Sequence, residues 1–325
     1  MIRMILAIGN SSNYEVNSFL AVQKALRKNG HDAILFKQDQ CLSGEFLGFQ
    51  IIHGGVSFYV AIDGKRYTID DFSAIWYLKP HLPRELLEET PAEYRHFVER
   101  QFLAMRQALW SISRNKYRLN DPWSTQIAEN KPYQLVIASQ SGFVLPDTLI
   151  TSDPNEVKQF YQNHQGKIVV KLLATSPIFD HVIYTNKVTP EHLEQIESVC
   201  KSPAIFQEIV PKAYELRITV VGNNIFPVKL YSQEDEATTL DWRRKPLTDD
   251  FTVKMELTEL PLNIKQKIYA LMNRLQLRFG CIDMIVTPTG QYVFLEINPE
   301  GQWYFVQLNT EEQIAEAIAA MLIAN

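Results

Sequence analysis

The stretch "CIDMIVTPTGQYVFLEINPEGQW", residues 281–303, decides the fold of this chain. Two apolar runs flank the turn residues "PTG", a pattern typical of a β-hairpin. A loop of two residues, Thr289 and Gly290, or of four residues would place Asp283 directly opposite Glu296. Directly opposed residues share one face of a sheet, with their Cβ atoms about 5 Å apart. We therefore expect two carboxylates to face the same side at one end of this hairpin.

A third polar side chain joins these two acids. Asn298 follows Glu296 by two residues, so it points to the same face of the strand. We expect the opposite face to be apolar and to carry Ile282, Met284, Val293 and Leu295. Two buried like charges repel, and one acid would take up a proton unless a cation lay between them. Oxygen ligands suit Mg²⁺, so the pattern predicts a magnesium site, and the alternative is a surface hairpin with solvated acids.

The composition is ordinary for a globular protein and excludes several function classes. The chain has 325 residues, enough for two or three lobes, with 46% hydrophobic and 21% charged residues. A net charge of -5 argues against a general nucleic-acid binder, which needs clustered Lys and Arg. Cys41, Cys200 and Cys281 fit neither a disulfide framework nor a local zinc site, and no apolar run suits a membrane span. We expect a cytoplasmic protein.

The order of the expected elements indicates an α/β protein. A strand at "RMILAIG", a helix over residues 14–30 and a strand at "DAILF" form a βαβ unit, and a hairpin follows around Asp63-Gly64. Near the end of the chain, "NIKQKIYALMNRLQLRFG" predicts a helix that stops at Gly280. Breaks in the pattern predict three lobes, an N-terminal α/β lobe over 1–114, a central lobe over 115–200 and a β-rich C-terminal lobe over 201–325.

Several charged residues elsewhere are candidates for binding a phosphate. Lys171 lies within the apolar strand "IVVKLL", where its charge requires a partner, either a nucleotide phosphate or a local group at the strand end. Glu215 and Arg217 alternate onto one face of a strand, which an ion pair on the sheet explains equally well. Arg243 in "DWRRK" lies in an expected loop and could hold a phosphate through two hydrogen bonds.

These motifs together resemble an ATP-grasp enzyme of the RimK-like branch, and within it the MvdD/MvdC-type peptide maturases of microviridin and other graspetide pathways. The resemblance rests on "AENKPYQLVIASQSGFVLPDTLITSDPNEV", "IVVKLL", "FQEIVPKAYELRITVVG", "DWR" and the hairpin quoted above, in this order. They span residues 115–303. The resemblance implies an ATP-grasp fold with an N-terminal pre-grasp lobe, ATP and Mg²⁺ as cofactors, and a possible homodimer.

Site residues follow from the same resemblance, position by position. The ATP-binding positions comprise two phosphate-binding lysines, three adenine-hinge residues and one acid, namely Lys131, Lys171, Gln207, Glu208, Val210 and Glu215. The arginines near the transferred phosphate correspond to Arg217 and Arg243. The metal ligands correspond to Asp283, Glu296 and Asn298, the set that the hairpin pattern predicts independently.

The chain departs from the family pattern at two places near the expected nucleotide. The segment after Lys171, "LLATSPIFD", has no glycine, whereas many ATP-grasp proteins cover the phosphates with a glycine-rich loop. The small residues Ala174, Thr175 and Ser176 can serve instead. Glu300 in "NPEGQW" stands where the family usually has Asn.

The resemblance also implies a reaction. ATP would activate an Asp or Glu side chain of a ribosomal precursor peptide, bound through its leader and core, as an acyl phosphate. A Ser or Thr hydroxyl or a Lys amine of the same peptide would then close a macrolactone or macrolactam ring. One alternative is a RimK-like ligase that adds free amino acids to a peptide or protein carboxylate. Another is a non-catalytic nucleotide-dependent peptide-binding protein.

Overall fold

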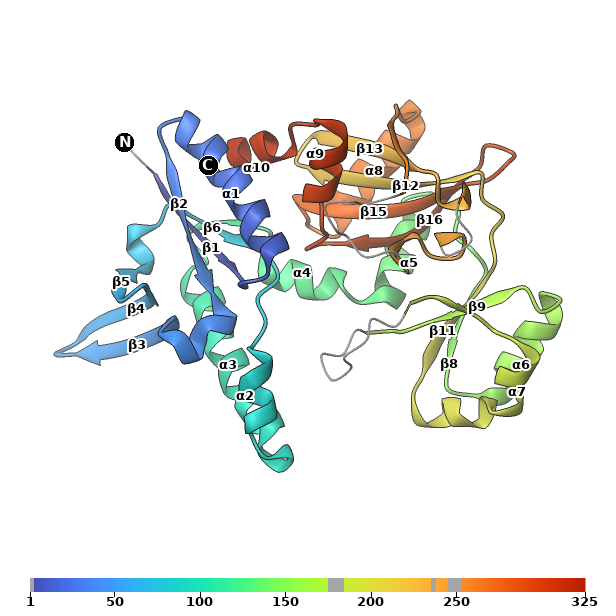
Figure 1. Ribbon diagram of the computed structural model, residues 1–325, viewed down its shortest axis with the longest axis horizontal. Helices are drawn as coiled ribbons and strands as arrows, with labels where there is room; N and C mark the ends of the chain where they lie inside the picture. The colour runs from blue at the N-terminus through green and yellow to red at the C-terminus, as the bar shows by residue number, and fades with distance from the viewer. Residues whose placement is uncertain (1–2, 175–183, 235–237, 245–252, 325) are drawn as a thin grey trace. The chain divides into compact units, whose positions relative to one another are not determined.

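The computed structural model describes residues 3–174, 184–234, 238–244 and 253–324 (Figure 1). The chain divides into two compact units, one formed by Met1–Trp123 with Gln313–Asn325 and the other by Ser124–Glu312. Helix α4 (Pro122–Ala128) spans the boundary between them. Within the described residues, no helix is long and apolar enough to cross a membrane.

A parallel sheet of four strands, in the order β2-β1-β6-β7, forms the centre of the first unit. The strands are β1 (Met4–Gly9), β2 (Asp32–Lys37), β6 (Ala74–Tyr77) and β7 (Tyr117–Leu119). Helix α1 (Asn13–Lys28) connects β1 to β2 and packs against the last helix of the chain, α10 (Ile314–Ile323). The expected βαβ unit is therefore confirmed, and the closing helix belongs to this unit.

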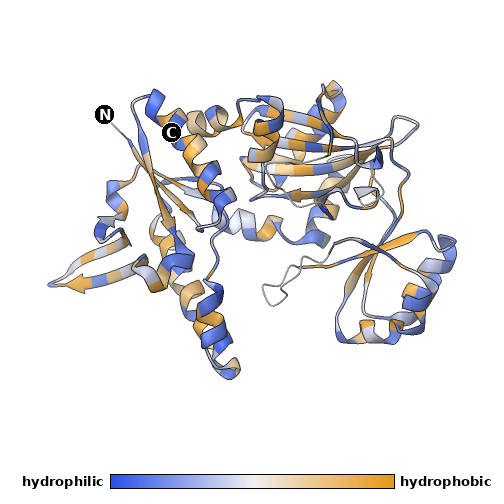
Figure 2. Cartoon of the chain, in the orientation of Figure 1, coloured by the Kyte–Doolittle hydropathy of each residue, from blue (hydrophilic) through white to orange (hydrophobic). Residues whose placement is uncertain are grey.

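An antiparallel sheet of three strands, in the order β3-β4-β5, accompanies this core, with helices α2 (Arg84–Glu89) and α3 (Ala92–Ile112). Its strands are β3 (Phe46–Ile52), β4 (Gly55–Ile62) and β5 (Lys65–Thr68). Asp63 and Gly64 both have positive φ angles, 49° and 73°, so the expected hairpin at this dipeptide is confirmed. Strand β3 was not expected, and its tip carries hydrophobic residues (Figure 2).

The second unit contains two sheets. An antiparallel sheet in the order β10-β9-β11-β8 comprises β8 (Thr148–Thr151), β9 (Ile168–Lys171), β10 (Asn186–Lys187) and β11 (Ala204–Glu208). Helices α6 (Pro154–Asn163) and α7 (Pro190–Glu194) belong to it, and Val157, Ile168 and Phe206 lie in their shared core. Asp153 is the N-cap of α6 and accepts a hydrogen bond from the Asn155 amide.

The larger sheet has five antiparallel strands in the order β14-β13-β12-β15-β16. They are β12 (Tyr214–Val221), β13 (Asn224–Leu230), β14 (Met255–Leu257), β15 (Phe279–Val286) and β16 (Tyr292–Asn298). Helices α5 (Lys131–Gln140) and α8 (Leu262–Arg274) share its core, and α9 (Tyr304–Thr310) follows β16. The expected stop of α8 at Gly280 is wrong, because the helix ends at Arg274 and Gly280 lies within β15.

The hairpin of β15 and β16 brings Asp283 opposite Glu296, as predicted, although the predicted loop length is wrong. Val286 pairs with Tyr292, which requires an odd number of loop residues. A β-bulge at Leu295 then shifts the register by one residue before Glu296 is reached. Two deviations from the simple pattern therefore cancel, and the two acids meet.

The same bulge changes which side chains reach the core. Phe294 pairs with Met284, is fully buried and stacks on Phe143 at 5.3 Å between ring centroids. Val293 and Leu295, which were expected beside Met284, lie outside this core cluster. The expected face is wrong at these two positions, because the extra residue reverses the alternation along β16.

We predict that Phe294→Ala lowers the free energy of unfolding by about 3–5 kcal/mol, because it empties a closed part of the core. Leu295→Ala removes a half-buried side chain outside that core and should cost clearly less. Denaturant-induced unfolding of both variants measures the difference. Equal losses, or a larger loss at Leu295, would contradict the bulged register.

Candidate active site

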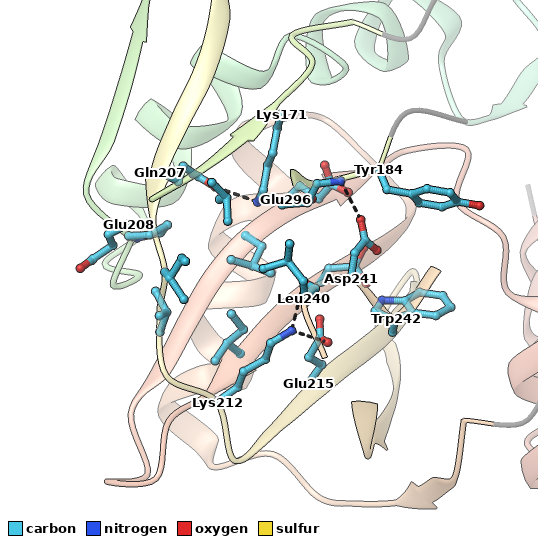
Figure 3. Close-up of a pocket in the computed structure, with 18 of the residues that line it drawn as sticks. Lys171, Tyr184, Gln207, Glu208, Lys212, Glu215, Leu240, Asp241, Trp242 and Glu296 are labelled. Atoms are coloured by element: carbon cyan, nitrogen blue, oxygen red, sulfur yellow. Dashed lines mark hydrogen bonds and ion pairs between the residues drawn. The ribbon is translucent and has the colours of Figure 1, made fainter. Parts of the chain in front are cut away.

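One pocket of the second unit collects most of the predicted site residues (Figure 3). Its walls come from β9, β11, the segment between β11 and β12, and the strands β15 and β16. All six predicted ATP-binding residues line it, namely Lys131, Lys171, Gln207, Glu208, Val210 and Glu215. Asp283 and Glu296 line it as well. The structure thus gathers residues from distant parts of the sequence, and their individual roles stay predictions.

Lys171 lies at the end of β9 and reaches a polar neighbour on β11. Its Nζ donates to Gln207 Oε1 at 2.7 Å (Figure 3). Gln207 Nε2 in turn donates to Thr148 Oγ1 at 3.0 Å. Gln207 is only 3% exposed, so this amide holds the lysine in a defined position. The two sequence interpretations of Lys171 are compatible, since the side chain has a local partner and still lines the pocket.

The main chain between β11 and β12 is anchored at both ends. The Glu208 amide donates to the Asp147 carbonyl at 3.0 Å and the Ile209 amide donates to the Lys167 carbonyl at 2.8 Å. At the other end, the Ala213 amide donates to the Val286 carbonyl at 2.8 Å. A segment fixed in this way can present backbone groups to a flat ligand, as the adenine-hinge prediction requires.

Lys212, in this same segment, was missed by the sequence analysis. Its Nζ donates to Glu215 Oε1 at 2.8 Å and to the Leu240 carbonyl at 3.3 Å. Glu215 is buried and also accepts a hydrogen bond from Ser232 Oγ at 2.6 Å. In the sequence, Lys212 is only a lysine that follows a proline. No local pattern predicts that the segment containing Leu240 lies beside it.

Arg217 binds Asp283 directly from the neighbouring strand. The two residues are paired across β12 and β15, and Arg217 Nη1 lies 2.9 and 3.0 Å from the two carboxylate oxygens. Both are nearly inaccessible, with 4% and 5% exposure. The suggested ion pair between Glu215 and Arg217 is therefore not the main contact of either residue, because Glu215 pairs with Lys212 and Arg217 pairs with Asp283.

Glu296 has a cation of its own. Lys131 stands at the first position of α5, whose N-cap Asn130 accepts a hydrogen bond from the Tyr133 amide. The Lys131 Nζ lies 3.2 Å from Glu296 Oε2. Asp283 and Glu296 can therefore both be ionised. Arg217 and Lys131 supply the positive charge without which two neighbouring carboxylates would repel each other.

The loop after β16 encloses the Arg217 guanidinium. Arg217 Nη2 donates to the Gln302 carbonyl at 2.7 Å, and Trp242 and Phe305 lie about the same guanidinium at 5.9 and 6.0 Å from their ring centroids. Cys281 is fully buried beside it, and this burial raises the pKa of its thiol, so the thiol stays protonated at neutral pH. Arg217 itself is not among the residues that line the pocket.

The remaining predicted residues are placed less directly. Asn298 is half-buried and follows Glu296 by two residues on the same side of β16. The backbone of Arg243 lies in the short helix Trp242–Arg244, and its side chain lies outside the described residues, as do Thr175 and Ser176.

Asp241 and Tyr184 line the pocket but were not predicted. The quoted motif "DWR" contained Asp241, whose carboxylate accepts a hydrogen bond from the Thr185 amide at 3.2 Å.

Solved structures similar to this chain include three peptide-modifying enzymes that match it over almost its whole length. The macrocyclase MdnC from Microcystis aeruginosa MRC, bound with the precursor peptide MdnA, has 30% identity, a TM-score of 0.86, and coverage of 99% of this chain and 100% of that chain. The chain belongs to the RiPP-associated ATP-grasp ligases, where RiPP denotes a ribosomally synthesised and post-translationally modified peptide. It is therefore an ATP-dependent ligase with the predicted ATP-grasp fold.

Other solved relatives agree. A RiPP-associated ATP-grasp ligase from Chryseobacterium gregarium, in complex with ADP and a leader and core peptide, has 29% identity, a TM-score of 0.84, and coverage of 99% of this chain and 96% of that chain. The macrocyclase MdnB from Microcystis aeruginosa MRC has 26% identity, a TM-score of 0.81, and coverage of 99% and 100%. No protein-family model and no curated protein matches the chain.

Gly301 gives a test of the loop that encloses Arg217. A Cβ atom at this position would lie 2.5 Å from Cys281 Cβ and 3.1 Å from Arg217 Nη2. We predict that Gly301→Ala lowers the free energy of unfolding by about 1–3 kcal/mol, because the overlap forces the loop away from the guanidinium. Thermal or denaturant unfolding measures this loss.

Gly55→Ala is a suitable control, because a Cβ atom there would meet only the Ile52 carbonyl, at 3.3 Å. It should cost less than Gly301→Ala. Full stability of the Gly301 variant would show that the ligase does not need this close packing.

Proposed function

We propose that this ligase couples ATP hydrolysis to cross-linking within a precursor peptide, with Mg²⁺ as the metal. An Asp or Glu side chain of the peptide takes the γ-phosphoryl group, which gives an acyl phosphate and ADP. A Ser or Thr hydroxyl or a Lys amine of the same peptide then displaces phosphate and closes a lactone or lactam ring. The observation that carries this proposal is the gathering of eight predicted residues around one pocket, in a chain 30% identical to a macrocyclase.

The lining of the pocket suits a nucleotide. It combines apolar side chains, among them Val169, Ile285 and Leu295, with charged groups. The apolar part is appropriate for a purine ring, and the lysines are appropriate for phosphates. The proposed adenine hinge comprises Gln207, Glu208 and Val210, and Lys131 and Lys171 are the proposed phosphate ligands.

The charge of the pocket supports a divalent cation as a further component. The lining contains three lysines, Lys131, Lys171 and Lys212, and five acids, Glu208, Glu215, Asp241, Asp283 and Glu296. Three positive and five negative charges line the pocket, and Arg217 pairs with Asp283 behind the lining, so an excess of one negative charge remains, to which a triphosphate adds more. Asp283 and Glu296 offer the carboxylate oxygens that Mg²⁺ prefers, and Asn298 adds an amide oxygen on the same side.

The proposed division of labour follows from the contacts. When bound, Mg²⁺ would neutralise phosphate oxygens and make the γ-phosphoryl group a better electrophile. Asp283 and Glu296 would hold it, and Arg217 would keep Asp283 ionised and oriented. Lys131 lies beside Glu296, so a phosphate at this place would meet a positive side chain. Arg243 is proposed to contact the transferred phosphate, and the homodimer and the cytoplasmic location stay predictions.

We predict that Glu296→Gln and Asp283→Asn each lower peptide-dependent ADP release by roughly 100-fold or more, because the charge that holds the metal is lost. Steady-state ADP assays measure the rate, and circular dichroism checks that the fold is kept. Glu259→Gln, at an exposed acid, is the control and should leave the rate unchanged. Unimpaired ADP release by either site variant would refute the metal assignment.

The reaction type is tested by mass spectrometry of peptides incubated with the ligase, ATP and Mg²⁺. Suitable substrates are MdnA and any short peptide rich in Thr and Asp or Glu that is found to be encoded beside the gene of this protein. We predict the loss of one water molecule for each ring formed. Addition of an amino-acid mass would favour a RimK-like ligase, and measurable ATP binding without ADP formation on any peptide would favour a non-catalytic protein.

A further inference from the structure

Three side chains near the hinge form a second cluster of possible metal ligands. Asp147, His164 and Glu208 each offer one ligand atom, and these atoms all lie within 4.8 Å of one another. His164 Nε2 is 3.2 Å from Asp147 Oδ2. Within the part of the chain that the structure describes, no other group of three such residues meets this distance.

The framework of this cluster is rigid. Asp147 directly precedes β8 and Glu208 is the last residue of β11, and two hydrogen bonds connect these two residues. The Glu208 amide donates to the Asp147 carbonyl at 3.0 Å, and the Asp147 amide donates to Glu208 Oε1 at 3.0 Å. His164 caps the end of α6, and its ring stacks on Phe160 at 4.2 Å between centroids. Two carboxylates and one imidazole are therefore held together by a strand pair and a helix end.

The tautomer of His164 decides what can lie between these groups. Its Nδ1 is 2.9 Å from the Phe160 carbonyl, which can only accept a hydrogen bond, so Nδ1 carries the proton. In the neutral ring, Nε2 is then an acceptor that faces an acceptor, the Asp147 carboxylate. Two lone pairs at 3.2 Å repel unless a proton or a metal ion lies between them.

We propose that Asp147, His164 and Glu208 form a Zn²⁺ site beside the pocket, which of these three residues only Glu208 lines. One imidazole nitrogen and two carboxylate oxygens are typical zinc ligands, and the exposure of Asp147 leaves a coordination position for water. The hydrogen bond from Nδ1 to a main-chain carbonyl is the arrangement that orients a metal-binding histidine. Mg²⁺ is a poor candidate here, because it prefers a set of oxygen ligands.

A proton competes with a metal ion for Nε2 of His164. The pKa of His164 is raised from its ordinary value, first by the hydrogen bond to the Phe160 carbonyl, so a metal ion that binds here has to displace a proton. A bound zinc ion would tie the end of α6 to Glu208, one of the residues of the proposed hinge. It would restrain the segment that carries Ile209 and Val210, without any part in the transfer of phosphate.

The test is a titration of the chelator-treated, full-length protein with ZnCl₂ by isothermal calorimetry, with Mg²⁺ in excess and no nucleotide or peptide. We expect one equivalent of Zn²⁺ to bind and to raise the temperature of unfolding. His164→Gln and Asp147→Asn should each weaken this binding by roughly 10- to 100-fold or more. His96→Gln, at an exposed histidine of α3, is the matched control and should bind as the unaltered protein does.

Two results would overturn the proposal. The first is equal zinc affinity in the unaltered protein and in His164→Gln, which would indicate adventitious binding only. The second is loss of zinc binding in a variant with Asp283→Asn and Glu296→Gln but not in His164→Gln, which would assign the zinc to the hairpin. Neither result bears on ligase activity, because the titration contains no ATP or peptide.

Discussion

The buried contact between Arg217 and Asp283 is the interaction on which the rest of the site depends. Both residues lie on adjacent strands in the middle of a sheet and are only 4% and 5% exposed, and Asp283 still lines the pocket. Removing one partner from such a pair typically costs about 3–5 kcal/mol, because a charge is left buried without compensation. A well-packed apolar pair would serve stability at least as well. The ion pair therefore makes most sense as a way to keep an ionised, oriented carboxylate at the pocket of this ligase.

This interaction explains several features around it. The Gln302 carbonyl and the rings of Trp242 and Phe305 complete the surroundings of the guanidinium, so both the segment that follows β16 and the short helix Trp242–Arg244 close it off from water. Gly301 is required because no Cβ atom fits between Cys281 and the arginine. Within the motif "NPEGQW", Gly301 and the main chain of Gln302 are thus explained by packing against Arg217, in addition to any role of Asn298 as a metal ligand.

The sequence predicted the two strands of the hairpin and the opposition of its two acids, but it failed for the register between the turn and the bulge and where contacts come from far along the chain. Opposition of Asp283 and Glu296 was predicted correctly, but from a loop length that the structure does not have. A bulge at Leu295 is invisible to an argument based on alternation, because Phe294 and Leu295 are both apolar. Lys212 was missed for a different reason, since its partner carbonyl at Leu240 lies in an irregular segment with no periodic pattern.

The two cations beside the hairpin acids differ in a way that matters for binding. Arg217 is held by three oxygen atoms, two from Asp283 and one from Gln302, and it is not part of the pocket lining. Lys131 lines the pocket, its side chain is 28% exposed, and it lies on a helix rather than on the sheet. A long, flexible ammonium side chain at a surface can change its partner at low cost, whereas an enclosed guanidinium cannot. Arg217 is therefore suited to be a permanent counter-charge of Asp283, whereas Lys131 has the mobility that the proposed phosphate ligand needs.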